Sequence, residues 1–158
     1  MTADAICMRN HRFKGHQVLL IKRKHEPYKG HLAFPGGFVN YGENPKVAIL
    51  RELKEETNLY GWEPTVAFVK GCPQRDPRKH VITIFYHVLV SDAEKVIAGD
   101  DAASAKWYNM FDIWMHKNWA FDHKEILFEY TEKHYPQYTT VDSKVSDKLW
   151  MSGIREMY

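Results

Sequence analysis

The alternation of apolar and polar residues predicts several short β-strands along the chain. Residues 2–9 (TADAICMR) alternate loosely, and residues 17–23 (QVLLIKR) form an apolar run that ends in charged residues. These two segments are typical of strands joined by a hairpin loop. The same patterning predicts strands over residues 64–71, 80–90 and 105–108.

The clearest helix is predicted over residues 44–57. Asn44 is a good N-cap residue, and Pro45 suits the first helical position because its missing N–H would have no partner there. Three residues spaced at i, i+3 and i+7 form the face that we expect to be buried, namely Leu50, Leu53 and Thr57.

A second helix is predicted over residues 123–134, where Asp122 and Glu125 have the spacing of a capping box. Residues 25–37 (HEPYKGHLAFPGG) form a long polar and aromatic loop, and a loop of this length in a compact domain is usually functional. Residues 135–158 are aromatic and mixed in character, and no element is assigned to them. Because strands and helices are interspersed, we expect a mixed α/β fold whose mixed sheet is covered on both faces.

Length and composition narrow the class of protein. The 158 residues fit a single domain, and 22 Lys and Arg against 20 Asp and Glu give a net charge of +2. This balance does not favour nucleic acid or an anionic membrane as a partner. Cys7 and Cys72 form no CxxC pair, and no apolar run approaches ~18 residues. We therefore expect a cytoplasmic, soluble protein.

Three carboxylates gather on the first predicted helix. At about 100° per residue, Glu55 and Glu56 lie on either side of Glu52, so all three share one face. Like charges at this spacing repel one another, and a divalent cation would reverse the sign of that interaction. The face is therefore either a solvated charged surface or a site for a hard cation such as Mg²⁺ or Mn²⁺.

The surrounding residues favour the cation site. The 23-residue segment from Gly37 to Leu59, with Glu43, Arg51-Glu52-Leu53 and Glu55-Glu56 at their spacings, resembles the Nudix box, G-x5-E-x7-R-E-U-x-E-E-x-G-U with U aliphatic. Asn58 replaces the final glycine of this pattern. Asn is the commonest residue other than Gly to accept left-handed backbone geometry, so the change conserves shape. The resemblance implies a Nudix-like α/β/α sandwich, with the mixed sheet between helices.

The same resemblance implies the roles of the box residues. The carboxylates of Glu52, Glu55 and Glu56 and a carbonyl of the turn at Gly37 would hold Mg²⁺, for which Mn²⁺ is a possible substitute. Arg51 would orient a carboxylate, and these four charged residues would form the catalytic group. Glu43 would fix the loop against the helix, although an acid near a helix N-terminus is also favourable without any other role.

The sequence does not say which carboxylate acts as the general base. Members of the family place that base either in the box or in a distant loop. The candidates outside the box are Asp100, Asp101, Asp122 and Glu125.

Several loops resemble the ADP-ribose pyrophosphatase branch of the family. They are the residues 22–30 that lead to Phe34-Pro35-Gly36-Gly37, the Arg75-Asp76-Pro77-Arg78 loop, the Gly99-Asp100-Asp101 turn and Phe121-Asp122-His123. Within these loops, Arg23 would bind phosphate or stack on adenine, and Tyr28 or Phe34 would stack on the base. Arg75 and Arg78 would bind the phosphate of the second ribose.

The resemblance therefore implies a Mg²⁺-dependent diphosphatase that converts ADP-ribose to AMP and ribose 5-phosphate. Another nucleoside diphosphate derivative is an alternative substrate: a nucleoside-diphosphate sugar, NADH, a dinucleoside polyphosphate or a nucleotide. A sensor that binds ADP-ribose without cleaving it is a third interpretation, which the intact set of carboxylates disfavours. The expected partner is a small molecule, and a homodimer is left open.

Overall fold

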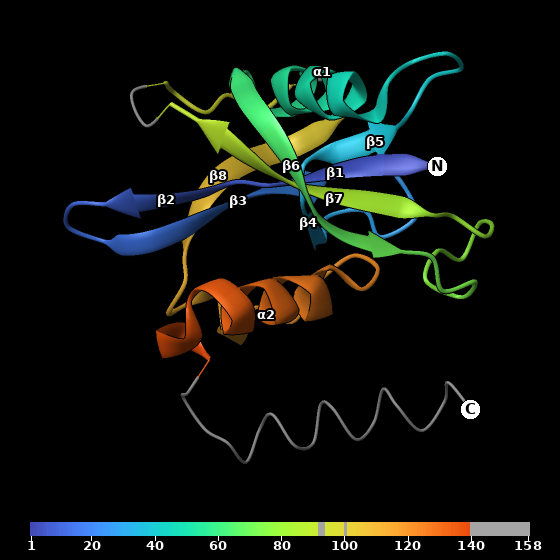
Figure 1. Cartoon of the computed structure of the whole chain (residues 1–158). Helices are drawn as coiled ribbons and strands as arrows, with labels where there is room; N and C mark the ends of the chain where they lie inside the picture. The colour runs from blue at the N-terminus through green and yellow to red at the C-terminus, as the bar shows by residue number, and fades with distance from the viewer. Residues whose placement is uncertain (92–93, 100, 140–158) are drawn as a thin grey trace. The chain divides into compact units, whose positions relative to one another are not determined.

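The computed structural model describes residues 1–91, 94–99 and 101–139, and the strands of this described part form two sheets (Figure 1). The elements follow in the order β1 (Thr2–Ile6), β2 (Met8–His11), β3 (Gly15–Arg23), β4 (Leu32–Ala33), β5 (Gly36–Phe38), α1 (Pro45–Thr57), β6 (Gly61–Lys70), β7 (Thr83–Val90), β8 (Ala102–Asn109), the 3₁₀ turn η1 (Ile113–Met115), α2 (His123–His134) and the 3₁₀ turn η2 (Pro136–Tyr138).

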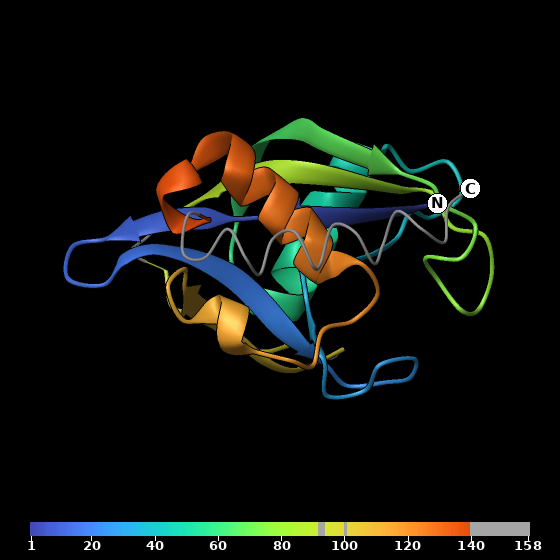
Figure 2. The ribbon, with the colours of Figure 1, turned by 90° about the horizontal axis from the view of Figure 1, so that it is seen from below.

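The first sheet has the strand order β5-β1-β7-β6 and is mixed. Strand β1 pairs parallel with β7 and antiparallel with β5, and β6 pairs antiparallel with β7. The second sheet is antiparallel, with β3 paired to β2, β4 and β8. Figure 2 shows β2 and β3 as a long hairpin, in which Arg9 pairs with Gln17.

Alternate residues of β1 point to the two opposite faces of the first sheet. Successive side chains of a strand point to opposite faces. Ala3 and Ala5 belong to the same buried cluster as Ile49 and Leu53 of α1, so they lie on the face that α1 covers. Thr2 and Asp4 therefore point away from α1.

Helix α1 begins and ends as its sequence predicts. The Asn44 side chain accepts a hydrogen bond from the Lys46 N–H, and Pro45 occupies the first turn. At the C-terminus, Asn58 adopts the left-handed conformation with φ 62°, and its N–H donates to the Lys54 carbonyl. Asn58 thus takes the backbone geometry that the glycine of the box pattern would supply.

Two expectations about the strands were wrong. The strand predicted over residues 2–9 is broken at Cys7, so that β1 and β2 belong to different sheets. The predicted loop 25–37 contains β4 and the start of β5, which pair with β3 and β1 respectively. The expected mixed α/β fold is confirmed, with its strands divided between two sheets. Local patterning could not show this, because each of these pairings joins residues distant in sequence.

The chain divides into two compact units, the first spanning Met1–Lys124 and the second beginning at Glu125. Helix α2 has the predicted bounds 123–134. Residues 140–158 of the unassigned segment lie outside the described residues, and one domain over residues 1–158 stays a prediction. Within the described residues, no helix is long and apolar enough to cross a membrane.

Candidate active site

A cavity of about 360 Å³ lies in the first unit, beside the residues that the sequence selects. Its described lining includes eight residues proposed from the sequence: Arg23, Phe34, Gly37, Glu52, Glu56, Arg75, Arg78 and Asp101. Carboxylates and guanidinium groups therefore line the same cavity. Such a site can bind a cation through the carboxylates and an anionic ligand through the guanidinium groups.

Glu56 is the most buried of the box carboxylates, at 6% exposed. Its Oε2 accepts a hydrogen bond of 2.9 Å from the N–H of Gly36. Burial, against the opposing hydrogen bond from Gly36 and together with the nearby carboxylates of Glu52, Asp4 and Asp101, raises the pKa of Glu56 to about 8. Such a concentration of negative charge at a buried position favours a cation.

Glu52 lies directly above the turn that contains Gly37. A Cβ atom on Gly37 would stand 2.6 Å from the Glu52 carboxylate, closer than real Cβ contacts allow. Only glycine lets the backbone approach this carboxylate so closely. Burial also raises the pKa of Glu52, although Arg51 acts in the opposite direction.

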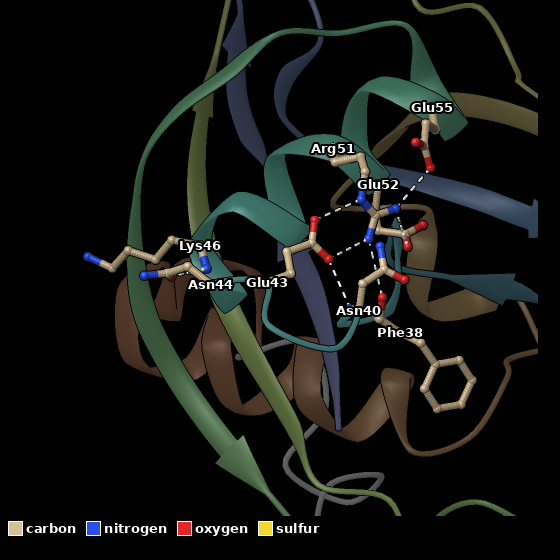
Figure 3. A network of polar contacts seen from close by, with 8 residues as sticks. All are labelled: Phe38, Asn40, Glu43, Asn44, Lys46, Arg51, Glu52 and Glu55. Carbon is tan, nitrogen blue, oxygen red and sulfur yellow. Dashed lines mark hydrogen bonds and ion pairs between the residues drawn. The ribbon is translucent and has the colours of Figure 1, made fainter.

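Arg51 ties the loop before α1 to the helix face (Figure 3). Its Nε and Nη2 donate to the two oxygens of Glu43 at 2.9 and 3.0 Å. Its Nη1 donates to Glu52 at 2.8 Å and to Glu55 at 3.1 Å. The hydrogen bonds from Arg51 hold the pKa of Glu43 at about 2. Glu43 therefore holds the loop against the helix through Arg51. A favourable interaction of an acid with the helix N-terminus alone would not require this pair of hydrogen bonds.

The box carboxylates differ in what they face. Glu52 and Glu56 line the cavity, whereas the Glu55 side chain is 56% exposed and binds Arg51. Among the described residues, no three His, Cys, Asp or Glu side chains stand in an arrangement that would hold a metal ion. The donor set is nevertheless all oxygen, close to backbone carbonyls and rich in negative charge, which fits Mg²⁺ or Mn²⁺.

Arg23 forms part of the cavity wall beside Phe121. Its guanidinium lies over the Phe121 ring at 5.1 Å, and its Nε donates to the Pro27 carbonyl at 2.8 Å. Burial, followed by the nearby charge of Arg78, lowers the pKa of Arg23. No carboxylate of a described residue accepts a hydrogen bond from Arg23, so Arg23 remains available to an anionic ligand.

The two aromatic residues proposed to stack on a base are placed differently from that expectation. Phe34 is 2% exposed and packs against Phe85 and His123, so its ring offers no free face. Tyr28 is absent from the described cavity lining, and its ring stands edge-on to Phe121 at 4.9 Å. Phe121, which the sequence analysis treated only as part of a loop, lines the cavity, as does Phe38.

Arg75 and Arg78 are held by carboxylates. Both oxygens of Asp122 accept hydrogen bonds from Arg75, at 2.6 and 2.9 Å, and only 5% of the Arg75 side chain is exposed. Asp122 thus forms an ion pair with a distant residue, and its capping-box role stays a prediction. Arg78 binds both oxygens of Asp76, and these hydrogen bonds lower the pKa of Asp76.

The remaining candidate bases are dispersed. Asp101 lies at the cavity and is mostly exposed, 3.5 Å from the Nε2 of His25. Asp100 lies outside the described residues, and Glu125 belongs to the second unit.

The sequence analysis gave no role to several polar residues of the cavity, among them Thr2, Asp4, Thr83 and His123. A signal for two of them was present, since Thr2 and Asp4 alternate with alanines in a strand that is otherwise apolar. His123 belongs to the Phe121-Asp122-His123 segment that resembles the family branch, but its contacts depend on residues distant in sequence.

Three known proteins are similar to this chain in sequence or in structure. The ADP-ribose pyrophosphatase of Methanocaldococcus jannaschii is 43% identical over 117 residues, which are 74% of this chain and 67% of that protein. The NUDIX domain of Shewanella oneidensis NrtR, solved with ADP-ribose, is 27% identical and superposes with a TM-score of 0.75, covering 84% of this chain and 86% of that one.

The third is a bifunctional NMN adenylyltransferase/ADP ribose pyrophosphatase of Francisella tularensis, solved with AMP and a manganese ion. It is 28% identical with a TM-score of 0.68, and the match covers 84% of this chain but only 41% of that one. The family model of the NUDIX domain matches residues 1–130, which contain α1, the glycine turn and the whole described cavity lining. On these grounds the chain belongs to the NUDIX domain family.

Proposed function

We propose that this chain is a divalent-cation-dependent diphosphatase that hydrolyses ADP-ribose to AMP and ribose 5-phosphate. The observation that carries the proposal is the pairing of the buried Glu56 and the adjacent Glu52 with the Gly36–Gly37 turn at one cavity. The 43% identical relative, an ADP-ribose pyrophosphatase, supports this choice of substrate.

The cation would be held by Glu52 and Glu56, with Glu55 and the carbonyl of Gly37 completing the set. When bound, a divalent cation polarises a phosphoryl oxygen, lowers the pKa of bound water and neutralises charge on the leaving phosphate. Arg51 keeps the Glu52 carboxylate in place through its 2.8 Å hydrogen bond. Release of Glu55 from Arg51 would let this exposed side chain turn toward the cation.

The other cavity residues would bind the substrate. Arg23 faces the cavity without a carboxylate partner among the described residues, so it is suited to a phosphate oxygen. The Phe121 ring, with Arg23 beside it, is suited to contact the adenine. Arg75 and Arg78 would order the loop between β6 and β7 around the ligand through their own ion pairs.

Hydrolysis of a panel of diphosphates by the purified full chain tests this proposal. We expect ADP-ribose to give the highest kcat/KM in the presence of Mg²⁺, with AMP and ribose 5-phosphate as products. Glu52→Gln and Glu56→Gln should each lower kcat by at least ~10² while the fold is retained. Full activity after exhaustive chelation would refute the cation requirement.

The panel also separates the alternatives. A tenfold preference for a nucleoside triphosphate, NADH or another nucleoside-diphosphate sugar would replace ADP-ribose as the substrate. Tight binding of ADP-ribose without turnover would identify a sensor instead.

A further inference from the structure

Two polar residues of β1 occupy a position where a strand normally carries apolar side chains. Strand β1 lies between β5 and β7, and Asp4 is 7% exposed. Thr2 and Asp4 share the face opposite Ala3 and Ala5, and both line the cavity. Burying a carboxylate is costly unless it gains hydrogen bonds or an opposite charge. The hydrogen-bond donors and acceptors that these two side chains leave unused therefore indicate which kind of group the cavity binds.

The hydroxyl groups of Thr2 and Thr83 together leave one hydrogen without an acceptor. Thr2 Oγ1 and Thr83 Oγ1 are 2.6 Å apart and share one hydroxyl hydrogen. Arg75, itself held by Asp122, donates its own hydrogen to Thr83 Oγ1. Two hydroxyls carry two hydrogens, and only one of them is used between the pair. One O–H donor at Thr2 and Thr83 therefore remains for a ligand in the cavity.

Asp4 leaves an acceptor unused. His123 Nδ1 accepts a hydrogen bond of 3.0 Å from the Phe34 N–H, so the ring hydrogen is on Nε2. That Nε2 faces Asp4 Oδ2 at 3.4 Å, a long contact. No residue in the described part of the chain donates a hydrogen bond to Asp4 Oδ1, which lies against Gly36. A carboxylate oxygen is thus left as an acceptor at the cavity.

We propose that Thr2 and Asp4 recognise hydroxyl groups of the terminal ribose of the substrate, and that they set the specificity of the enzyme for that sugar. This inference rests on the proposed function. Thr2 and Asp4 are two residues apart on one strand face, about 7 Å along the strand. One site offers a donor and the other an acceptor, and a sugar hydroxyl is both.

Other parts of the substrate fit this floor less well. A phosphate group only accepts hydrogen bonds and carries negative charge, so the Asp4 carboxylate repels it. The floor also adjoins the cation site, because Asp4 pairs with Gly36, whose N–H binds Glu56. A group bound at Asp4 therefore lies next to the diphosphate, to which each ribose of the substrate is attached, and the proposal assigns this place to the terminal ribose.

His123 and Arg75 act as positioning residues for this floor. His123 joins Asp4 to the backbone of Phe34, and Arg75 joins Thr83 to Asp122. Each of these side chains is buried, so the unused donor and acceptor are held in place before a ligand arrives. A site that is organised to bond a hydroxyl discriminates strongly against an analogue that lacks it.

The test measures kcat/KM for ADP-ribose and for two analogues whose terminal ribose lacks the hydroxyl at carbon 2 or at carbon 3. The wild type is expected to prefer ADP-ribose over at least one analogue by tenfold or more. Thr2→Val, which keeps the shape and removes the hydroxyl, should lower that preference at least tenfold, and so should Asp4→Asn. Thr2→Ser, which keeps the hydroxyl, should retain it.

Two controls separate recognition from damage to the site. Thr65→Val makes the same chemical change at an exposed position of β6, outside the described lining, and should leave the preference unchanged. The Kd of Mn²⁺, measured by electron paramagnetic resonance without substrate, should change less than threefold in Thr2→Val.

Each outcome decides between the two proposals. If the wild type hydrolyses ADP-ribose and the preference falls less than tenfold in both Thr2→Val and Asp4→Asn, the assignment of these residues is wrong and the proposed function stands. If the wild type does not hydrolyse ADP-ribose, the proposed function and this inference fail together. A loss of activity shared equally by all three substrates would show a structural role only, and it would also overturn the inference.

Discussion

The burial of Glu56 predicts that the metal-free protein loses stability as the pH rises from 5 to 8.5. Burial raises the pKa of this carboxyl in the folded state to about 8, from an ordinary value of 4.5. Between these two values the folded state holds a proton that the unfolded state has released. The free energy of unfolding therefore falls as the pH rises through this window, and it is highest at the acidic end.

The magnitude follows from the width of the window. A single proton of difference changes the free energy of unfolding by ~1.4 kcal/mol for each pH unit. Over the interval from 4.5 to about 8, the loss is at most about 5 kcal/mol. A domain of this size changes its Tm by roughly 2–4 °C per kcal/mol, so the loss corresponds to a change on the order of 10 °C.

Urea unfolding with a chelator present, followed by circular dichroism between pH 5 and 8.5, measures this loss in the wild type and in Glu56→Gln. The variant keeps size and packing but cannot titrate, so its profile should be flatter. The nine histidines are the same in both proteins, so their contributions cancel in the difference. Glu43 and Asp76, whose pKa values are lowered, lose their contributions only below the measured range.

Parallel profiles for the two proteins would refute this reasoning, because they would show that Glu56 titrates normally in the folded state. Mg²⁺ provides an independent check, since a cation binds only the deprotonated carboxylate. Stabilisation by millimolar Mg²⁺ should therefore be larger at pH 8.5 than at pH 5.5 in the wild type, and it should shrink at both values in the variant.

Three substitutions around the same helix test the remaining parts of the site. Arg51→Lys removes the guanidinium group whose two nitrogens bind both oxygens of Glu43. Thermal denaturation should therefore show a lower Tm, and activity assays a lower kcat. An unchanged Tm would show that this pair of hydrogen bonds contributes nothing to stability. Gly37→Ala places a Cβ 2.6 Å from the Glu52 carboxylate, and steady-state kinetics should show kcat/KM reduced by about tenfold or more, whereas wild-type kinetics would mean that the turn yields freely. Asn58→Gly relieves the left-handed strain at φ 62°, so chemical denaturation should show stability unchanged or raised by a few tenths of a kcal/mol with near-normal kcat; a clear loss of activity would assign Asn58 a further role.

The sequence by itself determined the local features of helix α1. Asn44 and Pro45 place its start, and Asn58 places its end, because capping depends on residues close in the chain. The i, i+3 and i+4 spacing of Glu52, Glu55 and Glu56 puts them on one face for the same reason. The pattern of the box also identified the family, which the match over residues 1–130 shows.

Only the tertiary structure decided which of these three carboxylates face the cavity and which other residues line it with them. Glu52 and Glu56 line the cavity whereas Glu55 does not, and Asp122 binds Arg75 across 47 residues of sequence. Phe34, a plausible stacking residue in the sequence, is enclosed by Phe85 and His123.

The floor of the cavity depends most strongly on long-range contacts. Thr2 meets Thr83 across 81 residues, and His123 reaches the backbone of Phe34 across 89. Periodicity shows that alternate residues of a strand share a face, but it does not show which strand lies beside it or what covers that face. Strand pairing and burial, which set the free energy of each polar contact, arise only when the whole first unit is folded.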